Sequence, residues 1–221
     1  MSTSTKNVAT TLIDQRPAVL YVDRGKRIVD LTIAILLLPS VLPIIAVLYV
    51  IIRRDGGASF FGHMRIGRDG KPFRCMKLRT MVPDAESALE IYLEANPEMR
   101  VVWERDYKLP QDPRVTRIGK FLRATSLDEL PQLWNVLKGD MSLVGPRPVP
   151  MDELTKYGQA KSFYTRVRPG ITGLWQVSGR NDLTYEERVN LDVSYVKSHT
   201  LAGDLGILFR TVGAVLQKTG K

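Results

Sequence analysis

The longest hydrophobic stretch of the chain runs from residue 31 to residue 52, and none of its 22 positions carries a charge. As a straight helix it would rise about 33 Å, which matches the hydrocarbon core of a bilayer. Pro39 and Pro43 lie in the middle of the stretch, where each removes a backbone donor and crowds the carbonyl four residues earlier. The pattern therefore predicts a membrane helix over residues 21–54 that is broken at Pro43, with Pro39 and Ser40 in the same bend.

Basic residues flank this stretch on both sides, which bears on its orientation. They are Arg24, Lys26 and Arg27 before it, and Arg53, Arg54, Arg65 and Arg68 after it. The positive-inside rule assigns both ends to the cytoplasm, and a re-entrant helix that turns at the prolines and returns to the same face satisfies both. One kinked span across the bilayer is the alternative. Residues 1–20, which are rich in Ser and Thr, are expected to form a disordered tail.

From residue 55 to residue 221 the pattern predicts a mainly helical α+β domain. Alternating segments at 60–66 and 72–81 flank Asp69-Gly70, and Asp-Gly is a strong signal for a small β-hairpin. Helical spacing predicts helices over residues 83–95, 117–122, 127–138, 185–198 and 204–217. The last two are amphipathic, and the final one could lie on a membrane or pack on the core. Prolines predict an irregular excursion over residues 96–114, and Gly and Pro predict loops over residues 145–180.

Composition narrows the chemistry that this domain can use. The chain has 221 residues and a formal net charge of +9, from 32 Lys and Arg against 23 Asp and Glu. Cys75 is the only cysteine, which excludes an intramolecular disulfide, and His63 and His199 cannot complete a zinc site with it. Any metal is therefore expected to be a hard ion held by carboxylates. The basic residues are scattered and no RNA or DNA motif is present, which argues against nucleic acid as a partner.

The segment from Ser126 to Pro131 opens the predicted helix 127–138 and has two interpretations. In the structural one, Ser126 and Glu129 form a capping box, and Asp128 complements the helix dipole. In the functional one, the helix start keeps the Asp128 carboxylate ionised, so that it could attack phosphorus. Glu129 could then hold a magnesium ion that neutralises a diphosphate.

Arginines in proline- and glycine-rich loops favour the functional interpretation. They are Arg123 just upstream, Arg147 in Gly-Pro-Arg-Pro, Arg168 in Arg-Pro-Gly and Arg180 in Ser-Gly-Arg-Asn. Prolines restrict the backbone beside them, so a planar guanidinium can meet phosphate oxygens with little entropy left to lose. Lys77 and Arg79, on the second hairpin strand, are weaker candidates. For each of these residues a solvated or structural role is the alternative.

A series of short motifs, in order from residue 24 to residue 217, carries a family resemblance. They are Lys26-Arg27-Ile28-Val29-Asp30, Lys77-Leu78-Arg79-Thr80-Met81, residues 126–130, residues 135–142, residues 144–148, residues 168–173, Gly179-Arg180-Asn181 and Leu191-Asp192-Val193. Together they resemble the bacterial sugar transferase family, the monotopic phosphoglycosyl transferases. The resemblance covers nearly the whole body of the chain.

The resemblance implies transfer of a sugar 1-phosphate from a UDP-sugar to undecaprenyl phosphate, with release of UMP. By motif, Asp128 would be the nucleophile that carries a phosphosugar, and Glu129, with Asp128 beside it, would bind Mg²⁺. The implied phosphate and nucleotide contacts are Arg123, Arg147, Arg168 and Arg180, and Asp192 is implied as a further member of the pocket. Lys77 and Arg79, from the hairpin strand, are the other expected substrate contacts. It also implies a re-entrant helix at the bacterial inner membrane, with the catalytic domain on the cytoplasmic face.

The chain departs from the family pattern at the helix break, where Leu42-Pro43 stands in place of Ser-Pro. This departure leaves the bend angle open. The sugar is also open among glucose, galactose and an N-acetylated hexose, and exopolysaccharide initiation with a hexose is the expectation. A homodimer is left open too. The alternative function is a catalytically inactive, membrane-anchored interaction protein of a polysaccharide assembly complex.

Overall fold

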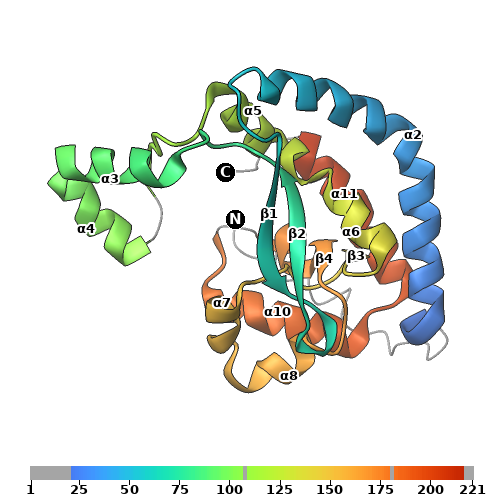
Figure 1. Ribbon diagram of the computed structural model, residues 1–221. Coiled ribbons are helices and arrows are strands. Elements are labelled where there is room, and N and C mark those ends of the chain that lie inside the picture. The colour runs from blue at the N-terminus through green and yellow to red at the C-terminus, as the bar shows by residue number, and fades with distance from the viewer. Residues whose placement is uncertain (1–20, 107–108, 180–181, 217–221) are drawn as a thin grey trace.

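A computed structural model describes residues 21–106, 109–179 and 182–216, and it is mostly helical (Figure 1). The helices are a π-helical turn at Tyr21–Gly25, α2 (Lys26–Arg53), α3 (Ala85–Ala95), α4 (Pro97–Asp106), α5 (Arg117–Thr125), α6 (Gln132–Lys138), α7 (Met151–Thr155), α8 (Lys161–Tyr164), α9 (Leu174–Ser178), α10 (Tyr185–Ser198) and α11 (Leu201–Leu216). The strands are β1 (Phe60–Ile66), β2 (Pro72–Leu78), β3 (Ser142–Val144) and β4 (Gly170–Thr172). The predicted mainly helical α+β class is confirmed. The predicted tail, residues 1–20, lies outside the described residues.

Helix α2 follows one side of the body and then turns over its end (Figure 1). Its 28 residues include Pro39 and Pro43, yet the helix is unbroken. The predicted break at Pro43 is therefore corrected to a bend within a continuous helix. Each proline frees one carbonyl and crowds it, which tilts the two halves, while the other backbone hydrogen bonds of the helix persist.

One face of α2 packs on the body and the remaining faces are exposed. The buried residues are Asp30, Ala34, Val41, Leu48 and Ile52, at helical intervals of four and seven. Among the described residues α2 is the one helix whose length and composition would let it cross a membrane, a test that core helices and signal sequences also pass. Only 17% of its most apolar window is buried, so the rest of the described chain leaves most of that window uncovered. Its exposed leucines, isoleucines and valines suit a lipid environment.

The predicted hairpin is present as the antiparallel pair β1–β2, with Ile66 opposite Pro72 and Phe60 opposite Leu78. Asp69 and Gly70 both have positive φ, 58° and 73°. That backbone conformation explains why Asp-Gly occurs here, because few other residues tolerate it at low cost. The second strand ends at Leu78 and not at Met81, which instead forms an isolated bridge with Val115.

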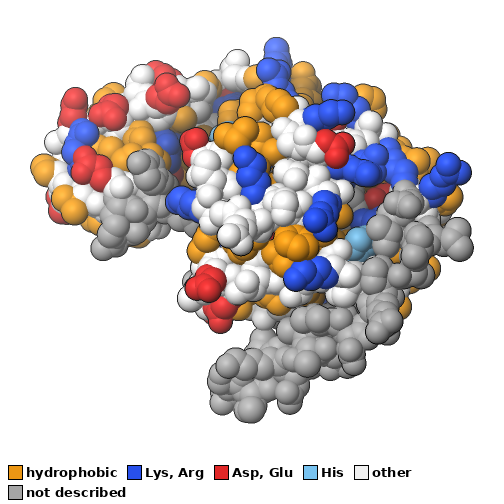
Figure 2. Space-filling model, turned by 90° about the horizontal axis from the view of Figure 1, so that it is seen from below, with side chains coloured by type: hydrophobic (Ala, Val, Ile, Leu, Met, Phe, Trp, Pro, Cys, Tyr) orange, Lys and Arg blue, Asp and Glu red, His pale blue; other side chains and the backbone are white. Residues whose placement is uncertain are grey.

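Two segments expected to be irregular contain regular structure. Residues 96–114 include α4, which begins at Pro97. Proline is compatible with a first helical turn because the missing N–H would have no partner there. Helices α3 and α4 protrude from the body (Figure 1). Residues 84–106 hold seven acidic residues and two arginines, and red side chains gather on that side of the molecule in Figure 2.

The second such segment, residues 145–180, contains α7, α8, α9 and the strand β4, which pairs in parallel with β3. Its glycines permit a close backbone approach. A Cβ on Gly170 would lie 2.1 Å from the Gly145 nitrogen, and one on Gly145 would lie 2.6 Å from the Arg168 carbonyl oxygen. The two Gly-Pro-rich motifs of the sequence are therefore packed against each other.

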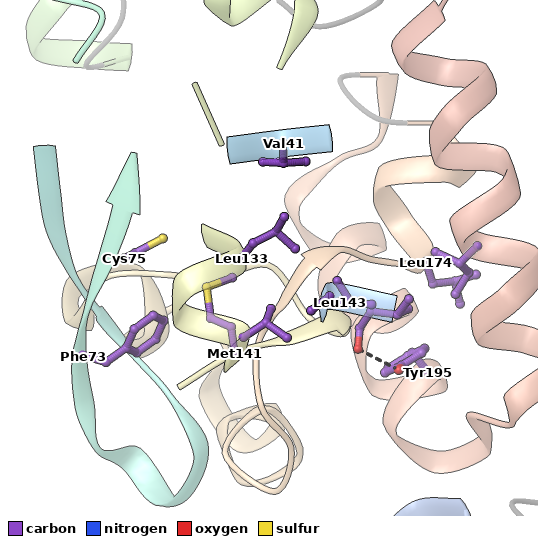
Figure 3. Close-up of a cluster of buried hydrophobic side chains, with 12 residues drawn as sticks. Val41, Phe73, Cys75, Leu133, Met141, Leu143, Leu174 and Tyr195 are labelled. Atoms are coloured by element: carbon purple, nitrogen blue, oxygen red, sulfur yellow. Dashed lines mark hydrogen bonds between the residues drawn. The ribbon is translucent and has the colours of Figure 1, made fainter. Parts of the chain in front are cut away.

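The main core joins α2, the hairpin and α6 (Figure 3). Val41 of α2, Phe73 of β2 and Leu133 of α6 belong to one buried cluster. Tyr195 of α10 closes it on the other side, where its hydroxyl lies 3.0 Å from the Val144 carbonyl oxygen. This core holds α2, the hairpin and the start of α6 in one unit.

Candidate active site

The chain turns sharply between α5 and α6, where Asp128 and Glu129 lie. Ser126 adopts the left-handed conformation (φ 57°), and its N–H closes α5 through the Arg123 carbonyl. Residues Leu127–Glu129 form a 3₁₀ turn, and α6 begins only at Gln132. The prediction of one helix over 127–138 is therefore wrong at its start. The capping box is wrong as well, because the Ser126 side chain makes no capping hydrogen bond.

Asn135 of α6 fixes this turn against the hairpin. Its side-chain oxygen accepts from the Met76 N–H at 2.9 Å, and its side-chain nitrogen donates to the Arg74 carbonyl at 2.9 Å. Asn135 is 2% exposed, so these hydrogen bonds are shielded from water and costly to lose. They set the register between α6 and β2, and they bring Lys77 to the Asp128–Glu129 turn.

Lys77 Nζ contacts both carboxylates. It lies 2.7 Å from Glu129 Oε1 and 3.3 Å from Asp128 Oδ2. The Asp128 side chain is 10% exposed, that of Glu129 22% and that of Lys77 27%. The adjacent acids predicted from the sequence are thus brought together with Lys77 of the second hairpin strand.

The environment separates the pKa values of the two acids. Burial raises the pKa of Asp128 above its ordinary value, and the charges of Lys77 and Arg123 oppose that rise. Burial acts on Glu129 in the same direction, but the charges of Lys77 and Arg147 together lower the pKa of Glu129 below its ordinary value. Glu129 is therefore the more firmly ionised of the two and the better permanent ligand for a cation.

A pocket opens beside this pair of acids. Its lining is Arg65, Cys75, Lys77, Glu129, Gln132, Arg147, Pro148, Ile171 and Gln176. Lys77, Glu129 and Arg147 were predicted from sequence motifs, whereas Arg65 and Gln132 were not. In the sequence, Arg65 stands among the basic residues that follow the hydrophobic stretch. The signal that could have found it is its position on the first hairpin strand, which the Asp-Gly turn folds back onto the strand that carries Lys77.

Three other predicted arginines have different positions. Arg123 donates to Thr80 Oγ1 at 3.0 Å, and its charge acts on Asp128. Arg79 donates to the carbonyls of Ala58 and Ile52, so it holds the C-terminal end of α2. Arg168 donates to the Gly139 carbonyl at 2.8 Å, at the C-terminal end of α6. The structure therefore brings Arg123 near the acids and leaves Arg79 and Arg168 outside the pocket lining.

Asp192 and Arg180 complete the predicted set. Asp192 of α10 is 2% exposed and accepts a hydrogen bond of 2.9 Å from the Tyr157 hydroxyl. Burial raises the pKa of Asp192 to about 7. Its Oδ1 has no hydrogen-bond partner among the described residues. Arg180 lies outside the described residues.

The carboxylates suit a magnesium ion only in combination with a substrate. No cluster of three or more His, Cys, Asp or Glu able to hold a metal occurs in the part of the chain that the structure describes. Mg²⁺ commonly takes one or two carboxylates and completes its shell with water and substrate phosphates. Asp128 and Glu129 fit that donor set.

Sequence comparison identifies the family in which this apolar helix and these adjacent carboxylates occur. The family model described as bacterial sugar transferase matches residues 21–218, and the chain belongs to that family. The chain is similar to several curated proteins. It is 52% identical over 195 residues to the UDP-galactose-lipid carrier transferase of Erwinia amylovora, and 47% identical over 197 residues to the exopolysaccharide production protein ExoY of Sinorhizobium fredii.

A third relative is the UDP-glucose:undecaprenyl-phosphate glucose-1-phosphate transferase of Klebsiella pneumoniae, 37% identical over 200 residues. The aligned regions cover 88%, 89% and 85% of this chain. They cover 41% of the Erwinia protein and 39% of the Klebsiella protein, but 87% of ExoY. The chain therefore matches only part of the longer relatives and most of the shorter one.

Proposed function

We propose that the chain transfers a hexose 1-phosphate from a UDP-sugar to undecaprenyl phosphate and releases UMP, as a membrane step of exopolysaccharide synthesis. The observation that carries this proposal is the pair of partly buried carboxylates, Asp128 and Glu129. Both contact Lys77, and they lie at the edge of a pocket that two arginines line. Relatives named for lipid-carrier transfer and for exopolysaccharide production support it.

In the first half of the reaction, Asp128 would act as the nucleophile. A carboxylate oxygen attacks the sugar-bearing phosphorus of the donor, and the bond from that phosphorus to the bridging oxygen breaks. UMP leaves with the electron pair, and an aspartyl phosphosugar remains. Lys77, which contacts Asp128, and Arg147, which lines the adjoining pocket, would offset the negative charge that would otherwise repel the attacking carboxylate.

In the second half, a phosphate oxygen of undecaprenyl phosphate attacks the same phosphorus. The bond to the Asp128 oxygen breaks, the carboxylate is restored and a lipid-linked diphosphate forms. Covalent storage lets a soluble donor and a membrane-bound acceptor use one site in turn, so ping-pong kinetics are expected.

A magnesium ion, when bound, would neutralise the diphosphate oxygens and stabilise UMP as a leaving group. Glu129 would be its firm protein ligand, because its pKa is held low, and Asp128 would lie beside it.

Membrane attachment follows from α2 and from the surface next to it. We place α2 in the cytoplasmic leaflet of the inner membrane as a re-entrant helix, with the catalytic domain on the cytoplasmic face. Exposed apolar side chains on α11 repeat at helical spacing: Leu201, Leu205, Phe209 and Val212. Trp134 of α6 and Phe121 of α5 are also exposed. An apolar face of this kind suits the headgroup boundary.

The experiment combines a donor panel with trapping of the intermediate. Membranes containing the full chain receive UDP-glucose, UDP-galactose or an N-acetylated UDP-hexose, each labelled in the phosphate next to the sugar. We expect UMP release and a labelled protein with one of these donors before any lipid phosphate is added. Asp128→Asn should remain in the membrane and form neither. Product formation without a labelled protein would overturn the intermediate, and an intact, donor-bound protein that never turns over would favour the non-catalytic alternative.

A further inference from the structure

Arg65 and Arg147 line the same pocket from different segments, β1 and the loop after β3. Neither guanidinium group forms a hydrogen bond or an ion pair with any residue in the described ranges. The Arg65 side chain is partly buried, and that of Arg147 is exposed. Burial lowers the pKa of Arg65, and the neighbouring charge of Arg147 lowers it further. The fold thus holds two like charges close together at the pocket, and an anionic ligand between them would relieve their repulsion.

Five other arginines of this protein donate to a carbonyl, a carboxylate or a hydroxyl: Arg27, Arg79, Arg114, Arg123 and Arg168. The guanidinium groups of Arg65 and Arg147 make no such contact within the described residues. Their position at a pocket indicates that they are kept available for an anion.

The charge of the pocket indicates which anion would fit. Its lining contains three cations, Arg65, Lys77 and Arg147, and one anion, Glu129. Glu129 contacts Lys77 and also interacts with the charge of Arg147, so the lining as a whole keeps a positive charge. Two guanidinium groups present two planar sets of donors. The oxygens of a phosphate group match both sets better than those of a single carboxylate do.

We propose that Arg65 and Arg147 form a two-arginine clamp for a phosphate ester, with Arg65 as a substrate-binding residue on the β-hairpin. The proposal rests on the proposed function, in which two phosphate esters bind at this site. One is the nucleotide of the donor, and the other is the phosphate of the lipid. Both have the chemistry that the clamp recognises. The hairpin would then supply groups to both parts of the site, Lys77 to the carboxylates and Arg65 to the phosphate.

The test separates the two half-reactions in Arg65→Gln, prepared as the full chain in lipid nanodiscs. Labelling of the protein by the UDP-sugar reports the donor step, and loss of the label to undecaprenyl phosphate reports the acceptor step. Losing one charge-assisted bidentate contact is expected to slow a step at least about tenfold. Arg65→Lys should recover part of the loss, because it restores the charge without the fork.

Arg74→Gln is the matched control, since Arg74 is an exposed arginine of the same hairpin that does not line the pocket. Binding of UMP and of uridine provides a readout that does not depend on turnover. We expect Arg65→Gln to weaken UMP binding at least about tenfold while uridine binding is unchanged.

The outcomes are distinct. A slower donor step with weaker UMP binding assigns the clamp to the nucleotide, and a slower acceptor step alone assigns it to the lipid phosphate. If Arg65→Gln matches Arg74→Gln in both steps and in UMP binding, the clamp is refuted even though the transferase activity stands. Absence of labelling in the unsubstituted chain would instead refute the proposed function, and the UMP and uridine titrations would still decide the clamp.

Discussion

Lys77 Nζ lies 2.7 Å from Glu129 Oε1. In the sequence, Lys77 is 51 positions away from Asp128, the residue before Glu129. This contact joins the β-hairpin to the 3₁₀ turn before α6, and it places one ammonium group between two carboxylates. Because the same ammonium is a counter-charge to both acids, the ionisation of the proposed nucleophile depends on the hairpin. The roles of Lys77, Asp128 and Glu129 can therefore be tested through the pH dependence or the metal dependence of the first half-reaction.

Replacing Lys77 with methionine should move the acid limb of the donor step to higher pH. Burial already raises the pKa of Asp128, and the charge and hydrogen bond of Lys77 counteract that rise. Without them the carboxylate stays protonated to a higher pH, and a protonated acid cannot attack phosphorus. The measurement is the rate of protein labelling by the UDP-sugar as a function of pH.

Lys71→Met is the control for this shift, because Lys71 is an exposed lysine just after the hairpin turn. Its acid limb should coincide with that of the unsubstituted chain. An acid limb in Lys77→Met that stays in place, with only the plateau reduced, would show that Lys77 does not set the ionisation of the nucleophile.

Replacing Glu129 with glutamine should weaken the response to magnesium. The substitution removes the carboxylate with the lower pKa and leaves Asp128 as the remaining acid of the pair. We expect the half-saturating Mg²⁺ concentration of the donor step to rise at least about tenfold. The comparison is Glu90→Gln, which removes a carboxylate from an exposed ion pair on α3. Equal magnesium dependence in the two variants would remove Glu129 from the metal site.

Replacing Arg168 with glutamine separates a structural role from substrate binding. Its guanidinium donates to the last turn of α6 at Gly139, where a positive charge also complements the helix dipole. We expect a loss of unfolding free energy of about 1.5–3 kcal/mol, measured by denaturant titration, with the KM for the UDP-sugar changed by less than about twofold. A large increase in KM with unchanged stability would instead return Arg168 to the substrate site.

Several features of this molecule could be predicted from local sequence because local physics determines them. The Asp69-Gly70 turn requires positive φ, and α10 begins at the capping box of Thr184 and Glu187 within one residue of its expected start. The acids of the site were found because adjacent Asp and Glu beside a family motif carry distinctive chemistry.

Long-range contacts account for the features that could not be predicted. Ser126 and Glu129 have capping-box spacing, yet Ser126 ends α5 in a left-handed conformation and the Glu129 side chain is taken by Lys77. Arg65 and Arg168 both carry a charge near a turn in the sequence. Tertiary packing places Arg65 at the pocket and Arg168 at the C-terminal end of α6. A sequence pattern gives the residue type and spacing, but not the partner that arrives from a distant segment.

The prolines of α2 should control its membrane topology. A double Pro39→Ala, Pro43→Ala variant restores two backbone donors, and a straight helix of 28 residues would rise about 42 Å, enough to span a bilayer. Arg24 and Arg54 are exposed at the two ends of α2, so Arg24→Cys and Arg54→Cys report the positions of those ends. The native Cys75 is buried and contributes little background labelling.

A membrane-impermeant maleimide should label both reporters from the cytoplasmic face when the prolines are present. In the double variant, one reporter should become accessible from the opposite face. Labelling of the two ends from opposite faces with the prolines intact would show a spanning helix, and the re-entrant placement would then be wrong.

Replacing Asp192 with asparagine should change how stability varies with pH. Burial raises the pKa of Asp192 to about 7, from an ordinary value of 3.8. Between these values the folded chain retains a proton on Asp192 that the unfolded chain has lost, so the contribution of Asp192 to stability falls as pH rises from about 4 to 7 and then levels off. The asparagine side chain does not ionise and avoids this loss, while its oxygen can still accept a hydrogen bond from Tyr157.

The Asp192→Asn variant should therefore match the wild type near pH 4 and exceed it above pH 7, by on the order of a few kcal/mol. Thermal unfolding of both proteins in the same detergent across this range gives the difference at each pH, which cancels the contribution of every other titrating group. A constant difference from pH 4 to pH 8 would mean that Asp192 titrates at an ordinary carboxyl pKa, with a counter-charge that keeps it ionised.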